Sequence, residues 1–329
     1  MKANASITYV GIDMAKNKFD ICIYDGDFSN CIYETYSNND DGFYQLLSYF
    51  NSINHLVGFR IGVEATSTYM IELQKFLDSQ KIRYVLINPK RISYYKKYKN
   101  FESKTDKLDS YYIADYITTL KDNIFNSSYN HTRYIYKAYQ AYINSLTKYQ
   151  TQQKGLSDSI LSDSFVSPSL RNNIIKANET IDKVRSESII EFTKLIKIAM
   201  PEYDLIKADI IGVSDMTLLA VLPLIYDVVD TYDKKQLQSY IGLNIIYKDS
   251  GSSVNKKQRV SKNGSEIARK QLYMSSVSAI QHNSVIKDKY QRLRENGKPH
   301  QVAMVACSAH LFRAIVSKLK HYKALNKND

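Results

Sequence analysis

The sequence predicts an α/β domain at the start of the chain, followed by a helical region that extends to its end. Within residues 7–88, short runs rich in β-branched and aromatic residues alternate with helical patterns. Strand signals are absent from residue 134 to about residue 198, where apolar residues recur at spacings of three and four. The last third is mostly helical in pattern, apart from one loop rich in serine and lysine. These patterns divide the chain into residues 1–125, 126–200 and 201–329.

Five strands and several helices are expected in residues 1–125. The strands are short β-branched runs bounded by turn residues, and they cover residues 7–13, 19–24, 31–36, 57–64 and 82–88. Helical patterns cover residues 43–50, 68–79 and 104–116. The first three strands read as an antiparallel meander. The expected order is therefore three strands, helix, strand, helix, strand, helix.

Two of these strands end in carboxylates, Asp13 on the first strand and Glu64 on the fourth. Functional groups collect at the carboxyl ends of strands in such sheets. A ribonuclease-H-like sheet places its first and fourth strands side by side and lays a later helix across their ends. Asp106 and Asp109, one turn apart on helix 104–116, would then face both strand acids. Spacing alone is more typical of a solvated acidic face, but the strand order favours a site for two Mg²⁺ or Mn²⁺ ions.

Four segments of this domain resemble the IS110 transposase family, which also contains site-specific invertases of the Piv type. They are YVGIDMAKNKFD, VEATSTYMIELQKFLDSQ, VLINPKRI and KTDKLDSYYIA. The resemblance implies a RuvC-like domain whose four acids are Asp13, Glu64, Asp106 and Asp109. Ser67 stands where the family usually has glycine.

The last third resembles the carboxy-terminal transposase domain of the same family. The matching segments are YIGL, an SG dipeptide eight residues after its glycine, SKNG, RKQLYM and GKPHQVAMVACSAHLFRAIVSKLK. A loop rich in serine and glycine is usually only a loop, but the resemblance implies that Ser250 is a nucleophile. Ser252 and Ser253 remain alternatives for that role. The resemblance covers nearly the whole chain.

Residues 126–200 are expected to form a helical coiled-coil spacer. One seam runs through Tyr139, Tyr142, Leu146, Tyr149, Gln153, Leu156 and Ile160. After a break at Pro168, a second runs through Ile174, Ala177, Ile181, Val184, Leu195 and Ile198. An intramolecular hairpin and a dimerising coiled coil fit these seams equally well.

Beyond the spacer, residues 208–225 resemble a helix-hairpin-helix with Gly212 at its turn, in which backbone N–H groups contact a phosphate. A plain turn between two helices fits equally well. The domain is therefore expected to be mainly helical.

The net charge of +12 and the pI near 9.2 favour a partner made of phosphates. Basic residues gather in a tyrosine-rich segment after residue 89 and around the serine loop. Taken alone, the first of these is as compatible with a solvated helix. The expected nucleic-acid contacts are Lys90, Arg91, Lys96, Lys97, Lys104, Lys256, Lys257, Arg259, Lys262 and Arg269.

The sequence gives no support for a metal site built from cysteine or histidine, for a membrane span or for a signal peptide. The three cysteines and six histidines show no metal-ligand spacing and read as side chains of a reduced, cytosolic protein. Apolar runs fall short of the roughly 18 residues that a membrane span requires, and the start lacks a signal-peptide core. We expect a cytoplasmic protein that joins the nucleoid when active.

The resemblance implies a DNA transposase or site-specific recombinase of a bacterial insertion sequence. It implies cutting and rejoining through a 5′-phosphoserine link, a structured bridge RNA as guide, and dimers that pair into a tetramer. Two alternatives fit the residues. One is a RuvC-like, metal-dependent DNA nuclease with water as nucleophile. The other is a non-catalytic nucleic-acid-binding protein, against which the four intact acids speak.

Overall fold

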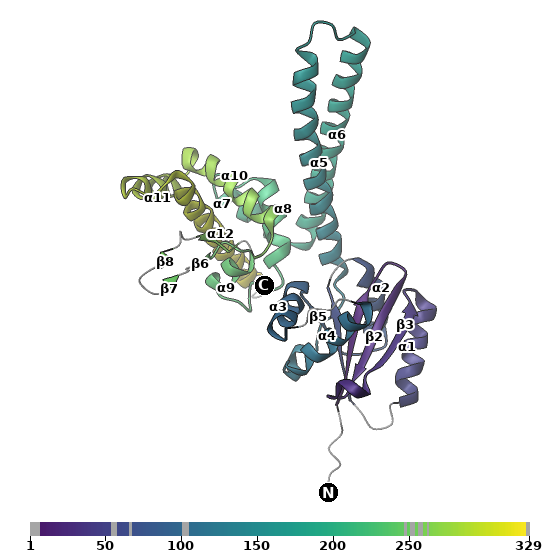
Figure 1. Cartoon of the computed structure of the whole chain (residues 1–329). Helices are drawn as coiled ribbons and strands as arrows, with labels where there is room; N and C mark the ends of the chain where they lie inside the picture. Colours follow the sequence, from purple (N-terminus) through teal and green to yellow (C-terminus); the bar gives the residue numbers. More distant parts are fainter. Residues whose placement is uncertain are drawn as a thin grey trace. The chain divides into compact units, whose positions relative to one another are not determined.

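The computed structural model describes residues 7–53, 58–65, 68–100, 105–246, 249–250, 254–255, 259–261 and 263–326. The chain divides into two compact units, Met1–Asn130 and His131–Asp329 (Figure 1). The division falls at the start of a long helix, so the spacer and the carboxy-terminal helices belong to one unit. Each unit is described by itself.

The first unit contains a mixed sheet with the strand order β3-β2-β1-β4-β5. Its strands are β1 (Ile7–Met14), β2 (Lys18–Tyr24), β3 (Ile32–Ser37), β4 (Gly58–Glu64) and β5 (Tyr84–Ile87). The first three form the predicted antiparallel meander, and β4 pairs in parallel with both β1 and β5. The predicted adjacency of the first and fourth strands is confirmed, as is the α/β character of this part.

Helices cover both faces of the sheet (Figure 1). They are α1 (Asp40–Ile53), α2 (Ile71–Ser79), α3 (Pro89–Tyr98) and α4 (Asp106–Thr118). On one face, the ring of Phe43 in α1 lies 5.9 Å from that of Phe19. On the other face, Tyr111 of α4 meets Tyr24 edge to face at 5.4 Å. Phe19 and Tyr24 both belong to β2, whose side chains alternate between the two faces.

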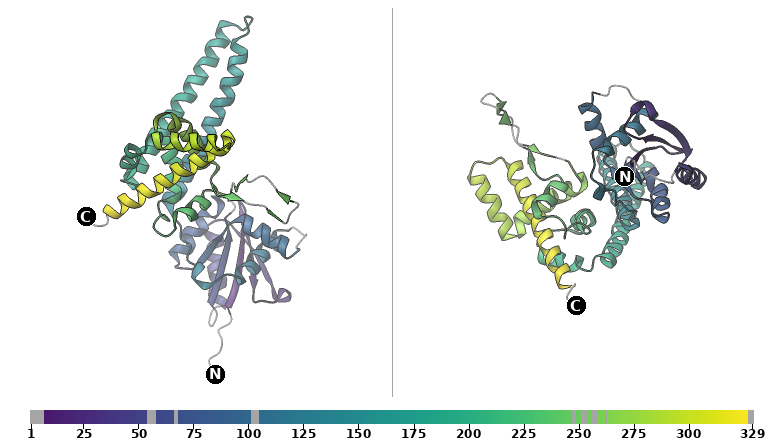
Figure 2. Two further views of the ribbon diagram at one scale, coloured as in Figure 1. Left: turned by 90° about the vertical axis from the view of Figure 1, so that its left-hand side faces the viewer. Right: turned by 90° about the horizontal axis from the view of Figure 1, so that it is seen from below.

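The second unit begins with an antiparallel hairpin of α5 (His131–Leu161) and α6 (Pro168–Ala199) (Figures 1 and 2). Polar contacts join the two helices along its length. Arg185 Nε donates to Thr147 Oγ1 at 2.9 Å, and Asn178 Nδ2 donates to Ser157 Oγ at 3.0 Å. Asp182 of α6 accepts from Gln150 of α5. Hydrogen bonds therefore join the two helices along the hairpin, and ring packing of Tyr139 on Phe192 adds an apolar contact at its base.

The predicted coiled-coil seam of α5 contacts α6 only in part, as where the Tyr139 ring stacks on Phe192 at 5.1 Å. Tyr142, Tyr149 and Leu156 are 50%, 49% and 58% exposed, and on α6 Ile198 is 80% exposed. The contact face of α5 is displaced by one residue, about 100° around the helix. The reason is the base of the hairpin, where Tyr136, Ile143, Phe192 and Ile196 are buried in the core of the second unit and fix the rotation of both helices.

The described part of the second unit contains six more helices around this core. They are α7 (Tyr203–Asp209), α8 (Asp215–Ile225), α9 (Lys234–Tyr240), α10 (Glu266–His282), α11 (Ser284–Glu295) and α12 (His300–Leu325). Of the described helices, α12 alone is long and apolar enough to cross a membrane by length and composition, which corrects the expectation that no such run exists. Its apolar stretch is 56% buried. Leu311, Phe312 and Ile315 belong to the core, so α12 acts here as a core helix.

The turn between α7 and α8 has the predicted glycine. Gly212 has φ +94°, a conformation that side chains rarely adopt. A Cβ at this position would also lie 2.7 Å from Cα of Ala279 in α10. The side-chain Nδ2 of Asn283 donates to the Ile211 carbonyl at 3.1 Å and connects the turn to the end of α10. Packing against α10 therefore accounts for the glycine, and phosphate binding by this turn stays a prediction.

Candidate active site

Two glycines bring helix α4 into direct contact with the sheet. A Cβ at Gly11 of β1 would overlap the Ser110 carbonyl oxygen and the Ala114 nitrogen of α4. A Cβ at Gly62 of β4 would lie 2.7 Å from Cγ2 of Ile117. Gly11 and Gly62 are register partners on the parallel strands, so the helix crosses both strands at the same level. The small Ser110 side chain, which is fully buried, suits this close approach.

The direction of α4 follows from its contacts with β4. Arg60 lies two residues before Gly62 and on the same face, and its Nε donates to Asp122 Oδ1 at 2.8 Å, just beyond the end of the helix. Residues nearer the start of β4 therefore contact residues nearer the carboxyl end of α4 or beyond it. Helix α4 runs antiparallel to β1 and β4, so its amino-terminal turn lies at the carboxyl ends of both strands.

Three of the predicted acids, Asp13, Glu64 and Asp109, have described side chains and lie at this edge of the sheet. Asp13 and Glu64 come two residues after Gly11 and Gly62, so both belong to the sheet face that α4 covers. Asp109 lies in the first turn of α4, and both strand acids and Asp109 are half-buried. Asp106 is the first residue of α4, but its side chain lies outside the described part of the chain. Among the described side chains, no three acids, imidazoles or thiols are close enough to hold a metal ion.

Asp109 has a cation as its neighbour. Lys96 of α3 forms an ion pair with Asp109, and their side chains are only 24% and 15% exposed. The same ammonium lies 4.9 Å from the centre of the Tyr112 ring. Burial, and then the charge of Asp109, raise the pKa of Tyr112, so its hydroxyl stays protonated. A basic helix that was predicted to contact nucleic acid thus also neutralises a predicted catalytic acid.

A second ion pair of the same kind lies further along α4. Asp115 accepts from the Tyr95 hydroxyl at 2.9 Å and pairs with Lys99 Nζ at 3.3 Å. Six residues separate it from Asp109, about 9 Å along the helix and away from the strand acids. Asp115 therefore reads as a structural contact between α3 and α4.

Sequence reasoning missed one acid beside the site. Asp20 of β2 is the register partner of Asp13, and its side chain lies on the same face of the sheet. It is 6% exposed and is held by Lys18 Nζ at 2.9 Å and by the Thr35 hydroxyl. The available signal was an acid inside an otherwise apolar strand. Because like charges on paired residues repel, these partners of Asp20 reduce the strain of placing it beside Asp13.

The donor chemistry of this edge fits a hard divalent cation. Carboxylate oxygens are the ligands that Mg²⁺ and Mn²⁺ prefer, and sulfur or imidazole ligands are absent from the predicted set. The ion pair with Lys96 shows that Asp109 already faces a cation in the structure. The residue types at this edge therefore suit a hard divalent cation, although the described acids are not gathered closely enough to hold one in this structure.

Ser250 lies on a narrow β-ribbon of the second unit. The ribbon consists of two antiparallel strand pairs. The pair next to the helices is β6 (Ile245–Ile246) with β9 (Arg259–Val260), and the pair further along the ribbon is β7 (Asp249–Ser250) with β8 (Val254–Asn255). Ser250 pairs with Val254 across the ribbon. Residues 251–253, including the alternatives Ser252 and Ser253, and the side chain of Ser250 lie outside the described part.

Two glycines fix the base of this ribbon. Gly242 ends α9 with φ +80°, and the N–H groups of Gly242 and Leu243 donate back to the carbonyls of Ser239 and Gln238. A Cβ at Gly264 would lie 2.5 Å from the carbonyl carbon of Ile241, and one at Gly242 would lie 2.9 Å from the Asn263 oxygen. The YIGL segment precedes the ribbon and the SKNG segment follows it. Because the two segments pack against each other, they hold the beginning and the end of the ribbon together.

The predicted basic contacts fall into three groups. Lys90, Arg91 and Lys97 are exposed on α3, where they can reach a ligand. Lys96 pairs with Asp109, and Arg269 donates to the Ile241 carbonyl at 3.2 Å, so both also have roles within the fold. Outside the described part lie Lys104, Lys256, Lys257, Lys262 and the side chain of Arg259.

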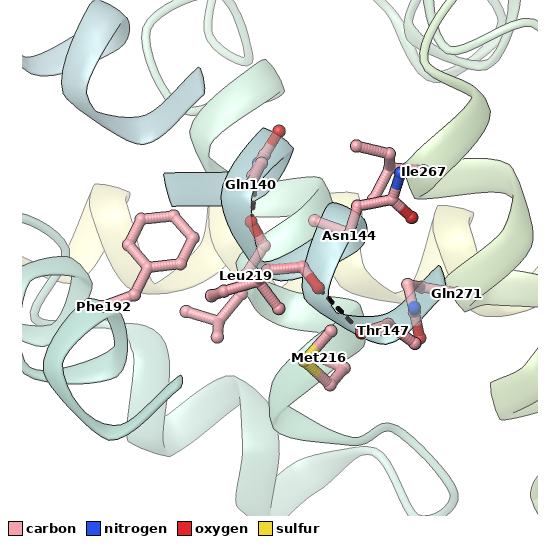
Figure 3. A pocket seen from close by; sticks show the side chains of 10 residues that line it. Gln140, Asn144, Thr147, Phe192, Met216, Leu219, Ile267 and Gln271 are labelled. Atoms are coloured by element: carbon pink, nitrogen blue, oxygen red, sulfur yellow. Dashed lines mark hydrogen bonds between the residues drawn. The ribbon is translucent and has the colours of Figure 1, made fainter. Parts of the chain in front are cut away.

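A pocket in the second unit offers no competing site. It has an empty volume of about 320 Å³ and lies where α5, α6, α8 and α10 meet (Figure 3). Gln140 Nε2 crosses it to donate to the Leu219 carbonyl at 2.7 Å. Its lining residues, among them Asn144, Phe192 and Met216, include no ionisable side chain. The pocket therefore lacks the groups that acid–base or metal chemistry needs.

The cysteines also lack the features of a reactive site. Cys22 is buried and Cys31 half-buried, and burial raises the pKa of both thiols. Cys307 is buried in the second unit with its pKa raised for the same reason. All three remain protonated and unreactive at neutral pH.

Comparison with known proteins identifies two matching family models. One, described as “Transposase” and built for the DEDD domain of the IS110 group, matches residues 10–158. The other, described as “Transposase IS116/IS110/IS902 family”, matches residues 207–291. Two pilin gene-inverting proteins, from Moraxella bovis and Moraxella lacunata, are each 27% identical to this chain over 336 aligned residues. These alignments cover 98% of this chain and 98% of each relative.

Proposed function

This chain belongs to the IS110 family and is a DNA transposase or recombinase, and we propose that it cuts and rejoins DNA through Ser250 at a metal-assisted carboxylate site. The observation that supports the carboxylate site most is the docking of α4 through Gly11 and Gly62, which directs its first turn toward Asp13 and Glu64. The strand order and this crossing helix also support a RuvC-like fold for the first unit.

In this proposal, Asp13, Glu64, Asp106 and Asp109 hold two divalent ions. Bound there, the ions would lower the pKa of an attacking hydroxyl and stabilise the charge on the leaving oxygen. Lys96, which now neutralises Asp109, becomes free to contact a phosphate when an ion takes its place.

Ser250 supplies the nucleophile. Its hydroxyl oxygen attacks the phosphorus of a phosphodiester, a serine ester of the 5′ phosphate forms, and the 3′ oxygen leaves as a hydroxyl. A 3′ hydroxyl from another strand then displaces the serine oxygen. One phosphoester bond forms for each that breaks, so rejoining needs no ATP. The strand pairs of the ribbon and the contacts at its base support this role, because they hold Ser250 on a β-strand rather than within a helix.

The proposed reaction requires parts of both units. The acids belong to the first unit and Ser250 to the second. Activity then depends on the sheet edge and the ribbon meeting at one phosphodiester, within one chain or between subunits. A structured RNA transcribed from DNA beside the gene is the proposed guide, and the cytoplasm, at the nucleoid, is the proposed place of action.

Recombination of the DNA that flanks the gene tests this function. The purified protein should join donor and target segments in the presence of Mg²⁺ and the RNA transcribed from the flank, and should lose this activity in EDTA. Joined products would be counted by sequencing across junctions. Cutting without joining would instead indicate the metal-dependent nuclease, and activity that persists in EDTA would contradict the metal site.

A second copy of this chain is the proposed partner of the hairpin. Tyr142, Tyr149 and Leu156 recur every seven residues and are 49% to 58% exposed, and Ile160, four residues after Leu156, is 41% exposed. These residues are the part of the predicted coiled-coil seam that the hairpin itself leaves exposed. Because Thr147 and Ser157 of α5 face α6 through hydrogen bonds, these exposed apolar residues are available to pack against the same residues of another copy.

Leu156→Glu should weaken this association. A charge buried in an apolar seam is expected to raise the dissociation constant of the dimer at least about tenfold, because it must be desolvated or the seam must open. Sedimentation equilibrium measures the effect. Gly155→Glu is the matched control, since it adds the same charge one residue away, where a side chain meets nothing within 4 Å. Equal mass distributions for wild type and Leu156→Glu would rule out this interface.

A further inference from the structure

Cations on and beside α12 have hydrogen-bond partners that are neutral. Lys289 of α11 donates to Nδ1 of His310 at 3.3 Å, because an ammonium group has no acceptor. Arg313 Nη1 donates to Oε1 of Gln238 in α9 at 2.8 Å. Lys320 Nζ donates to the Tyr232 carbonyl at 2.8 Å. Each cation is thus held in place without being neutralised.

A fourth cation extends the same face. Lys234 Nζ at the start of α9 donates to Ser317 Oγ at 2.7 Å. Ser317 lies between Arg313 and Lys320 on α12, and α9 and α11 both pack against this helix (Figure 1). We call Lys234, Lys289, Arg313 and Lys320 the α12 cation row.

Other lysines of the same helix are neutralised by carboxylates. Lys318 pairs with Asp209 at 2.6 Å, and Lys323 pairs with Asp230 at 3.3 Å. In the described part of the chain, the members of the cation row take part in no ion pair within 4.0 Å. Acids of the second unit therefore do pair with cations of α12, but they pair with Lys318 and Lys323 rather than with the cation row.

Electrostatics within the row are repulsive. Burial and the charges of Lys289 and Arg313 lower the pKa of His310, so its imidazole is neutral at pH 7. Burial and the charge of Arg313 likewise lower the pKa of Lys289. Like charges that approach one another in a half-buried place are stabilised by an external anion. The row is therefore a better match for a polyanion than for water alone.

We propose that the α12 cation row binds the phosphodiester backbone of duplex DNA, the substrate of the proposed function. Positions 310 to 320 of α12 span about 15 Å, which corresponds to roughly four nucleotide steps of one strand. The neutral partners fix the side chains beforehand, so less conformational entropy is lost when phosphates bind. Contacts of this kind hold the DNA in register without reading its sequence.

Fluorescence anisotropy with labelled duplex DNA of random sequence tests the proposal on the full-length protein. The variant Lys289→Gln/Arg313→Gln should bind more weakly, and the slope of log affinity against log salt should fall in magnitude by about two. The matched control, Lys318→Gln/Lys323→Gln, also removes two positive charges, both from α12, but takes away cations that carboxylates neutralise. Its slope should stay close to that of the wild type.

Three outcomes would overturn the proposal. The first is an equal loss of DNA affinity in both double variants. The second is a salt slope of Lys289→Gln/Arg313→Gln that matches the wild type. The third, from the same assay with labelled RNA of equal length, is a variant that loses affinity for RNA but not for DNA. Lys320→Gln guards against misfolding of the double variant, because it removes a cation bonded to a backbone carbonyl and should lower the slope by about one. The assay needs no cleavage. Wild-type protein that binds through the row but never cuts DNA would refute the proposed function and leave this inference standing.

Discussion

Ser250→Ala is expected to abolish both DNA cutting and the covalent link between protein and DNA. Alanine keeps the size of the position but removes the only atom that can attack phosphorus. Loss of a nucleophile typically lowers the rate by about a thousandfold or more. A radiolabelled, nicked duplex incubated with Mg²⁺ and then denatured in SDS would show the wild-type adduct as a band of reduced mobility. The variant should give no such band.

Neighbouring serines provide the matched controls for this experiment. Ser252→Ala and Ser253→Ala make the same chemical change within three residues of Ser250, and both should retain the adduct. An adduct lost in one of them but kept in Ser250→Ala would move the nucleophile along the loop. Cutting by Ser250→Ala at the wild-type rate, without any adduct, would make water the nucleophile and favour the metal-dependent nuclease.

The sheet and the edge where its acids lie were predictable because their signals are local. β-branched runs marked the strands, and the acids at positions 13 and 64 ended two of them. Adjacency of β1 and β4 followed from the order of elements. What the sequence did not reveal was the mechanism of docking, in which Gly11 and Gly62 admit α4 to the sheet. A glycine inside a strand becomes informative only when the helix above it is known.

Contacts between elements were harder to predict. Lys96 read as one more cation of a basic helix, and only the packing of α3 on α4 shows its ion pair with Asp109. Two-residue strands such as β7 carry no periodic pattern, so the ribbon that holds Ser250 was not predicted. The helical hairpin could be read from apolar spacing, but the rotation of α5 depends on core residues such as Phe192, which come from another helix.

Asp109→Asn is expected to remove most DNA cleavage while leaving DNA binding intact. An amide is a weak ligand for Mg²⁺ and carries no charge, so the stabilisation that the ion gives the transition state would be lost. That stabilisation amounts to several kcal/mol, which corresponds to a rate loss of about a hundredfold or more. Cleavage rates would be compared at saturating protein, and binding of Mn²⁺ would be followed by its electron paramagnetic resonance signal. The cleavage rate and the affinity for Mn²⁺ should both fall in Asp109→Asn.

Asp115→Asn separates this effect from damage to the fold. Asp115 is an acid of the same helix, is 6% exposed and also pairs with a lysine of α3. Its replacement loses a charge-assisted contact whose acid has a more buried side chain than Asp109, 8% against 15% exposed, so the midpoint of thermal unfolding should fall by a similar amount in both variants. Cleavage and Mn²⁺ binding should nevertheless stay near wild type, because the side chain lies about 9 Å along the helix from Asp109. If both variants lost activity in proportion to their lost stability, Asp109 would be a structural acid and the carboxylate site would need other residues.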